Sequence, residues 1–279
     1  MTSTEPGVMN LNGKVAFVTG GAGGFGRAIT QILLENGAQV ALCDIDEDRT
    51  QAAAKELGAV GFTLDVSDFE ANHKVVADIE AHFGGLDIAF LNAGISGGLR
   101  GADALDLDGY RRIMGINLDG VVYGTDAVLP ALRKRGGGCI VATASMAGLV
   151  APPGNPFYAL TKAAVIGYVR SLGVELAHDG IRMHALCPGF ADTPIINRMR
   201  DNFEKANFPI IEPRTVAETF IEAVKSPDSG LAWLIQAGVE PAPFKFRGVP
   251  AARHADGTRA GVPTSVNPDA QKPNSGGNK

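Results

Sequence analysis

Short apolar runs alternate with longer amphipathic segments along most of the 279-residue chain. The apolar runs, each bounded by turn-forming or polar residues, have the length and composition of buried parallel strands. They lie at 14–19, 39–43, 60–64, 86–91, 139–145, 181–187 and 231–236. Helical spacing marks the segments 27–36, 46–57, 69–83, 110–135, 157–178 and 215–225. This alternation predicts one α/β domain with a doubly wound parallel sheet of about seven strands and helices on both faces.

A glycine-rich loop follows the first predicted strand. Gly20, Gly24 and Gly26 have the spacing Gly-x-x-x-Gly-x-Gly, with Phe25 between the last two, and a helix is predicted next. Glycines let a backbone approach a pyrophosphate closely, and the free N–H groups of the helix N-terminus favour its negative charge. The order strand, glycine loop, helix therefore predicts a Rossmann-like fold with a dinucleotide cofactor, against the alternative of a plain flexible loop.

The second predicted strand ends at Asp44. A carboxylate roughly twenty residues past the glycine loop is placed to accept hydrogen bonds from the adenosine ribose hydroxyls. It would also repel the 2′-phosphate of NADP, and no Arg or Lys stands within 20–26 or 44–46 to offset that repulsion. We therefore expect NAD rather than NADP. The alternative is that Asp44 is only a turn or capping residue.

Tyr158 and Lys162 are four residues apart in a predicted helix and so share one face. An ammonium beside a phenol favours the phenolate, so Lys162 is expected to lower the pKa of Tyr158 from about 10 and make it a usable general base or acid. Ser145 ends the preceding strand and can lie beside Tyr158. Taken alone, a Tyr and a Lys at this spacing are more often a pair on the protein surface. The glycine loop near the N-terminus makes the catalytic interpretation stronger here.

Other small or polar residues also follow predicted strands. The full set is Gly20, Asp44, Asp65, Asn92, Ser145 and Pro188. The carboxyl ends of parallel strands meet at one edge of a doubly wound sheet, which is where such folds bind ligands. Residues far apart in the sequence are therefore predicted to form one site.

The ordered set of motifs resembles the classical short-chain dehydrogenase/reductase family over roughly residues 10–236. The matching residues are Thr19, Gly20, Gly24, Gly26, Asp65, Asn92, Ala93, Gly94, Asn117, Ser145, Tyr158, Lys162, Pro188, Gly189 and Thr193. The resemblance implies an NAD-dependent oxidoreductase that interconverts a secondary alcohol and a ketone by hydride transfer. Such an enzyme has a small-molecule alcohol or ketone as its substrate.

The same resemblance assigns four catalytic residues. Tyr158 would take a proton from the substrate hydroxyl, and Ser145 would orient the same oxygen. Lys162 would lower the pKa of Tyr158 and hold the nicotinamide ribose. Asn117 would anchor a water that relays the proton, with a satisfied buried amide as the alternative.

For the cofactor, the resemblance implies that Asp65 meets the adenine and that the backbone of 92–94 meets the adenosine ribose side. Thr193 would meet the nicotinamide carboxamide, with helix capping as the alternative. The predicted cofactor residues are Gly20, Gly24, Phe25, Gly26, Asp44, Asp65, Val66, Asn92, Ala93, Gly94, Tyr158, Lys162, Pro188, Gly189 and Thr193.

Composition narrows the classes of partner and compartment. Thirty acidic against 25 basic residues give a net charge of −5, which argues against nucleic acid and anionic membrane surfaces as partners. The three cysteines form no Cys-x-x-Cys and the histidines show no metal-ligand spacing, so we expect reduced core thiols and no metal. Neither a secretory signal nor an apolar run of the roughly 18–20 residues that span a membrane is visible. These features predict a cytoplasmic protein.

The chain is expected to divide into a flexible lead-in at 1–10, a catalytic domain at 11–245 and a Pro/Gly-rich tail at 246–279. Within the catalytic domain, 194–214 occupies the place of the family's substrate lid. The resemblance also implies a homodimer or homotetramer that packs through the long helices near 110–135 and 157–178.

Apolar residues are expected to wall the substrate pocket. Ile195, Ile196, Met199, Phe203 and Phe208 would form one side, and Met146, Leu149, Val150 and Phe157 the other. This predicts an apolar alcohol of sterol, terpenoid or aryl-alkyl type. The alternative is that these side chains only pack the lid.

Two other functions are compatible with parts of the pattern. One is a ketoreductase that acts on 3-oxoacyl groups with NADPH, against which the missing basic residues count. The other is a non-catalytic NAD-sensing protein, which would not need all four catalytic residues. The extended epimerase branch, by contrast, has a different glycine spacing and a longer C-terminal domain.

Overall fold

The computed structural model describes residues 10–97, 105–150, 152–248 and 250–260. The chain forms two units, Met1–Phe244 and Lys245–Lys279. In the described part of the second unit, Arg253 and Arg259 form an antiparallel β-bridge, and the His254 amide donates to the Thr258 carbonyl oxygen.

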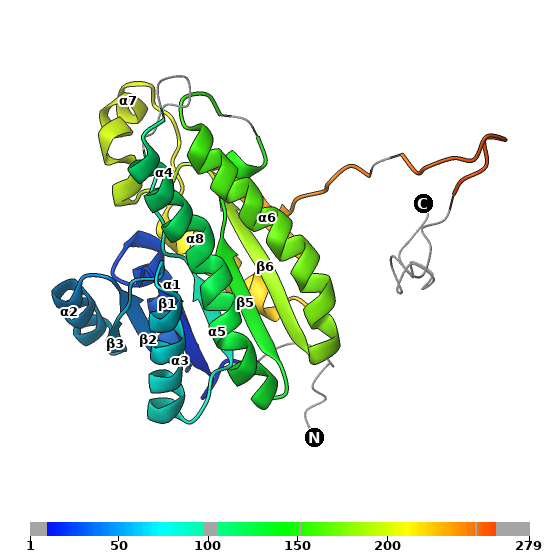
Figure 1. The fold of residues 1–279 in the computed structure, drawn as a ribbon. Coiled ribbons are helices and arrows are strands. Elements are labelled where there is room, and N and C mark those ends of the chain that lie inside the picture. The colour runs from blue at the N-terminus through cyan, green and yellow to red at the C-terminus, as the bar shows by residue number, and fades with distance from the viewer. Residues whose placement is uncertain (1–9, 98–104, 151, 249, 261–279) are drawn as a thin grey trace. The chain divides into compact units, whose positions relative to one another are not determined.

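The first unit is built on an eight-stranded sheet with the order β3-β2-β1-β4-β5-β6-β7-β8 (Figure 1). The strands are β1 (Val15–Thr19), β2 (Gln39–Asp44), β3 (Val60–Thr63), β4 (Ile88–Leu91), β5 (Gly138–Thr143), β6 (Ile181–Pro188), β7 (Leu231–Gln236) and β8 (Val239–Pro243). The first seven strands pair in parallel, and β8 is antiparallel to β7. The carboxyl ends of the parallel strands therefore share one edge.

Helices connect these strands and cover both faces of the sheet. They are α1 (Gly24–Glu35), α2 (Glu47–Leu57), α3 (Phe69–Phe83), α4 (Leu107–Met114), α5 (Gly120–Lys134), α6 (Pro156–Leu176), α7 (Arg200–Lys205) and α8 (Pro213–Lys225). Buried side chains of α3, α5 and α6 form one core with the sheet, and those of α1 and α8 form the other. The predicted Rossmann-like, doubly wound class is confirmed.

The structure differs from the sequence prediction in several elements, one of which is helix α7 inside the predicted lid. The eighth strand was not predicted, because Pro241 and Pro243 argue against a strand; both are tolerated here because β8 is an edge strand. Helix α1 begins at Gly24 and not at 27, so the last glycines of the loop form its first turn. The predicted helix 110–135 consists of α4, a π-helical turn (Gly115–Asp119) and α5.

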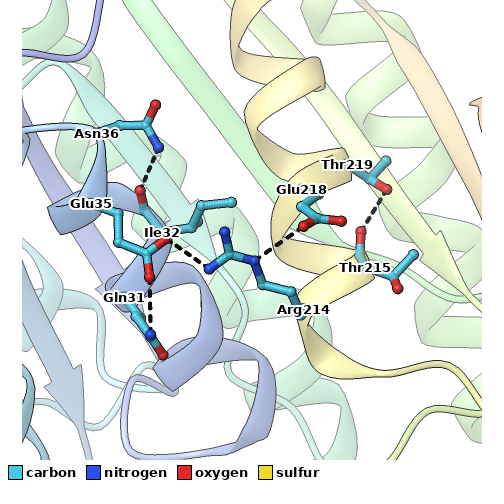
Figure 2. Close-up of polar contacts among 8 residues, drawn as sticks. All are labelled: Gln31, Ile32, Glu35, Asn36, Arg214, Thr215, Glu218 and Thr219. Atoms are coloured by element: carbon cyan, nitrogen blue, oxygen red, sulfur yellow. Dashed lines mark hydrogen bonds and ion pairs between the residues drawn. The ribbon is translucent and has the colours of Figure 1, made fainter.

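An exposed ion-pair network joins the end of α1 to the start of α8 (Figure 2). The Arg214 guanidinium lies 2.7 Å from a Glu35 carboxylate oxygen and 3.1 Å from one of Glu218. At the C-terminal end of α1, the Asn36 side-chain amide donates a 2.8 Å hydrogen bond to the Ile32 carbonyl oxygen. These contacts lie where the chain re-enters the core after the predicted lid.

Candidate active site

At two glycines of the loop the backbone leaves no room for a side chain. Gly20 has a φ of +62°, and a Cβ added to Gly26 would lie 2.2 Å from the Gly20 carbonyl oxygen. Gly23 is the N-cap residue of α1, so no side chain caps the helix, and no acidic residue stands in its first turn. The loop and the helix N-terminus together form a backbone cradle for an anionic group.

Asp44 is oriented by the same loop. Its Oδ2 accepts a 3.1 Å hydrogen bond from the Ala22 amide, and its Oδ1 accepts one of 2.9 Å from the Ile45 amide. The capping role belongs to Asp46, which accepts from the Arg49 amide at 3.0 Å. The carboxylate of Asp44 thus faces the glycine loop with lone pairs left for a ligand.

A cavity of about 310 Å³ opens between this loop and the neighbouring strand ends. Most of the predicted cofactor residues line it, namely Gly20, Gly24, Phe25, Asp44, Asp65, Val66, Asn92, Ala93, Gly94 and Thr193. Gly26, Pro188, Gly189, Tyr158 and Lys162 do not line it, nor do Asn117 and Ser145. The glycine cradle and the oriented carboxylate fit a nicotinamide dinucleotide, with NAD as the predicted form.

Two arginines in this cavity were not singled out from the sequence. Arg49, in the first turns of α2, and Arg112, in α4, both line it. Neither lies within 20–26 or 44–46, the segments whose lack of basic residues favours NAD. Helical spacing would have found Arg49, because it lies about one turn into the helix that follows Asp44.

Asn92 ties the end of β4 to the ends of β1 and β5. Its side-chain amide donates to the carbonyl oxygens of Thr19 and Gly20, and its Oδ1 accepts from the Thr143 hydroxyl at 3.0 Å. The Thr19 hydroxyl in turn accepts from the amides of Asn92 and Ala93. This network fixes the backbone of 92–94 along the cavity wall.

Asn117 lies in the π-helical turn and is fully buried. Its Oδ1 accepts from the Ile95 amide at 2.8 Å, and its Nδ2 donates to the Ile95 carbonyl oxygen at 2.9 Å and to the Thr161 hydroxyl at 3.3 Å. The π-turn, which is frequent at functional sites, explains why this polar residue interrupts an apolar helix pattern.

Lys162 is buried beside Asn117 and the end of β4. A Cβ added to Gly94 would lie 3.3 Å from Asn117 Oδ1 and 3.5 Å from Lys162 Nζ. The Lys162 ammonium donates a 2.7 Å hydrogen bond to the Thr143 carbonyl oxygen. Burial lowers the pKa of this lysine to about 8. Gly94, which lines the cavity, therefore connects it to the predicted catalytic residues.

Tyr158 lies one turn before Lys162, with its ring centroid 5.6 Å from the ammonium nitrogen. Burial raises the pKa of the Tyr158 phenol, and a hydrogen bond with Ser145 opposes that rise. The expectation that Lys162 by itself lowers this pKa is therefore wrong for this structure. The reason is that desolvation disfavours the phenolate.

Ser145 stands where β5 leads into a short 3₁₀ turn, Met146–Gly148. Its hydroxyl accepts from the Ala147 amide at 3.1 Å and lies 3.5 Å from the Pro188 carbonyl oxygen, to which it donates. The structure thus brings Ser145, Tyr158 and the end of β6 together, as the sequence predicted.

The predicted lid is closed at its base and packed internally. The Ile211 amide donates to the Phe190 carbonyl oxygen, and the Asp192 amide donates to that of Ile211. Phe190, Phe203 and Phe208 pack their rings together with centroids 4.7 to 5.9 Å apart. Of the residues proposed for the pocket wall, Phe203 and Phe208 therefore pack the lid.

Of the other residues proposed for the pocket wall, some pack against the protein and one lines the cavity. Ile196 is buried, whereas Ile195 lines the cavity. Phe157 packs against the Tyr110 ring, and Leu149 packs against the core. Part of the predicted wall is thus accounted for by packing.

A family model described as short chain dehydrogenase matches residues 14–204. The 3beta-hydroxysteroid dehydrogenase 2 of Eggerthella lenta is 37% identical over 70% of this chain and 77% of that protein. The 2-dehydro-3-deoxy-L-rhamnonate dehydrogenase (NAD(+)) of a Sphingomonas species is 37% identical over 67% and 76%. The cyclohexanol dehydrogenase of an Acinetobacter species is 34% identical over 73% and 81%.

Solved structures show the same similarity. A short-chain type dehydrogenase/reductase from Mycobacterium marinum superposes with a TM-score of 0.76 at 28% identity, covering 82% of this chain and 96% of that one. A 3-ketoacyl-(acyl-carrier-protein) reductase from Brucella melitensis, complexed with NADH, gives 0.74 at 29% identity, covering 82% and 98%. Among the described residues, no helix is long and apolar enough to cross a membrane.

Proposed function

Because the chain belongs to the short-chain dehydrogenase/reductase family, we propose that it is an NAD-dependent oxidoreductase that interconverts a secondary alcohol and a ketone. One observation carries the proposal. Tyr158 and Ser145 meet beside a buried Lys162 at the carboxyl edge of the sheet, and Gly94 connects this group to the cofactor-sized cavity.

In the oxidation direction, the Tyr158 phenolate takes the proton from the substrate hydroxyl, while the Ser145 hydroxyl hydrogen-bonds the same oxygen. Bound NAD⁺ supplies the hydride acceptor and a positive charge that favours the phenolate. Lys162 holds the nicotinamide ribose, and Asn117 anchors a water between Lys162 and solvent. In the reverse direction, Tyr158 gives its proton to the ketone oxygen.

Most of the proposed cofactor contacts line the cavity, and Gly26, Pro188 and Gly189 are proposed beside it. Gly20, Gly24, Phe25 and Gly26 hold the pyrophosphate, and Asp44 accepts hydrogen bonds from the adenosine ribose. Asp65 and Val66 lie at the adenine, and 92–94 contributes backbone on the ribose side. Pro188, Gly189 and Thr193 hold the nicotinamide end.

NAD is proposed over NADP because Asp44 presents a carboxylate at the ribose position. A relative whose name specifies NAD(+) and a structural neighbour complexed with NADH support this choice. Arg49 and Arg112, which line the same cavity, favour the alternative of an NADPH-dependent 3-oxoacyl reductase. The similarity to the Brucella melitensis reductase supports only the 3-oxoacyl part of that alternative, since the cofactor in that structure is NADH.

The proposed substrate is an apolar alcohol of sterol, terpenoid or aryl-alkyl type. Two relatives are named for a hydroxysteroid and for cyclohexanol, which supports it, but a third is named for a sugar acid. Ile195, which is 46% exposed and lines the cavity, supplies an apolar surface toward the site.

We further propose a homodimer or homotetramer in the cytoplasm that packs through α5 and α6. Leu160 and Val174 on α6 are 48% and 61% exposed, and apolar residues so placed suit a helix–helix interface. Light scattering of the wild type and of Val174→Asp tests this, and an oligomer that the charge leaves intact would contradict it.

The experiment that tests the activity measures NADH formation from a panel of secondary alcohols, with NAD or NADP. Tyr158→Phe is the active-site variant, and Tyr168→Phe on the same helix is the matched control. Turnover that is lost in Tyr158→Phe and kept in Tyr168→Phe is expected. NAD binding without turnover of any alcohol or ketone would favour a non-catalytic NAD sensor.

A further inference from the structure

Asn155 precedes α6, the helix that carries Tyr158, and is its N-cap residue. Asn is a preferred N-cap residue, because its side chain can accept a hydrogen bond from the first turn. Here the side chain makes no capping bond. Instead, its Nδ2 donates a 2.8 Å hydrogen bond to the carbonyl oxygen of Ser96, in the loop after β4.

The Asn155 Oδ1 is buried and, among the described residues, has no hydrogen-bond partner. A buried acceptor without a partner costs stability, and native structures rarely keep one without a reason. The side chain therefore gives up the capping bond, its Oδ1 has no partner in the described part of the chain, and its one hydrogen bond there goes to Ser96.

That bond closes a ring of contacts around Tyr158. Ser96 follows Ile95, whose amide and carbonyl are both held by the Asn117 side chain. Asn117 also donates to the Thr161 hydroxyl, which donates to the Tyr158 carbonyl oxygen at 2.8 Å. From Tyr158 the chain returns to Asn155 within the first turn of α6.

We infer that Asn155 is a positioning residue, which holds the first turn of α6 against the loop after β4 and so fixes Tyr158 relative to the cofactor cleft. The inference rests on the proposed function. Without the Asn155 amide, the ring is open at one place, and the hydrogen bond that ties the start of α6 to the loop after β4 is lost. Small misplacements of catalytic groups are costly even when the fold is intact.

The test compares Asn155→Leu with Asn36→Leu. Asn36 makes a matched bond, also 2.8 Å from side-chain amide to carbonyl, at the far end of α1 (Figure 2). We expect kcat to fall about tenfold to a hundredfold in Asn155→Leu, with little change in Asn36→Leu. The melting temperatures of the two variants should be similar, because Asn155→Leu also removes an unpaired acceptor. Asn155→Asp, which keeps the shape and lacks the donor, serves if the leucine variant does not fold.

A second measurement needs no substrate. Ultraviolet difference titration, with the Tyr158→Phe spectrum subtracted, follows the Tyr158 phenol in each protein. A loosened first turn admits water, so the phenol should titrate closer to its ordinary range in Asn155→Leu and Asn155→Asp. An unchanged titration together with a kcat no lower than that of Asn36→Leu would overturn the inference. A wild type without turnover would refute the proposed function, and the titration would still decide the role of Asn155.

Discussion

The Lys162 ammonium donates its 2.7 Å hydrogen bond to the Thr143 carbonyl oxygen at the end of β5. Strand β5 therefore fixes this buried cation independently of Tyr158. Its position lets it stabilise negative charge that forms nearby, whereas burial by itself raises the pKa of the Tyr158 phenol. The protonation of Tyr158 is thus set by several competing groups, of which Ser145 is one that can be removed.

We expect alcohol oxidation to rise with pH in the wild type, because it needs the Tyr158 phenolate and burial raises the pKa of that phenol. Ketone reduction needs the protonated phenol and should fall as the pH rises. The Ser145 hydrogen bond lowers the same pKa, so the residual oxidation activity of Ser145→Ala should reach its rising limb at higher pH. Initial rates of oxidation and reduction, measured against pH at saturating cofactor, give the rising and falling limbs of the two pH–rate profiles. A limb that Ser145→Ala leaves in place would show that the titrating group is not Tyr158.

Replacing Asp44 should shift the cofactor preference. Asp44→Ser removes the carboxylate that would repel a 2′-phosphate, while Arg49 in the same cavity can attract one. The ratio of kcat/KM for NAD to that for NADP should fall about tenfold to a hundredfold, the scale of a lost charged hydrogen bond. Asp46→Asn is the control, because Asp46 caps α2 and does not line the cavity.

Arg49 provides a second comparison for the same experiment. If Arg49 attracts the 2′-phosphate, the double variant Asp44→Ser/Arg49→Ala should lose the increase in kcat/KM for NADP that Asp44→Ser alone shows. Equal ratios for wild type and Asp44→Ser would remove the basis for the proposed NAD preference.

The sequence was sufficient for the seven parallel strands and their ligand-binding edge, because each of these strands is a self-contained apolar run, whereas the edge strand β8 was missed. Asp44 and Asn92 could be placed at that edge simply because they end such runs. The π-turn at Asn117 could not be predicted, since it depends on tertiary bonds to Ile95. The same holds for the contact between Asn155 and Ser96, which are 59 residues apart. The direction of the Tyr158 pKa depends on the burial of the phenol, which a spacing rule does not contain.

Alanine substitutions at two glycines of the loop should differ in whether a second substitution can rescue them. A Cβ at Gly24 would lie 2.8 Å from the Thr193 Cγ2 methyl, whereas one at Gly26 would lie 2.2 Å from the Gly20 carbonyl oxygen. Both substitutions should weaken NAD binding. Thr193→Ser removes the obstructing methyl and should partly restore binding to Gly24→Ala. It should give no relief to Gly26→Ala, whose obstacle is backbone.

Calorimetric titration of NAD into the single and double variants measures this difference. Rescue of both alanine variants by Thr193→Ser, or of neither, would contradict the packing seen at the loop.

The ion pairs of the chain should differ sharply in their effect on stability. Asp87 has a side chain only 3% exposed and lies 2.9 Å from Lys14 and 3.0 Å from Arg135, at the edge of the sheet away from the site. Its carboxylate also accepts from the Val15 amide. Desolvation would raise the pKa of Asp87, but the bonds from Val15, Lys14 and Arg135 outweigh it and hold that pKa below its usual range.

Asp87→Asn leaves two cations without their shared partner and should lower the free energy of unfolding by about 2 kcal/mol, the scale of hydrogen bonds to a charged group. The cost is not larger because Lys14 and Arg135 are 38% and 36% exposed and stay solvated. Arg214→Ala also removes two ion pairs (Figure 2). The Arg214, Glu35 and Glu218 side chains are 42 to 58% exposed, so its effect on the free energy of unfolding should be much smaller than that of Asp87→Asn. Because a lowered pKa stabilises the fold only while the carboxylate is ionised, the cost of Asp87→Asn should shrink as the pH falls through that pKa. Urea unfolding of both variants at neutral and acidic pH measures these differences, and equal losses for Asp87→Asn and Arg214→Ala would show that burial does not govern them.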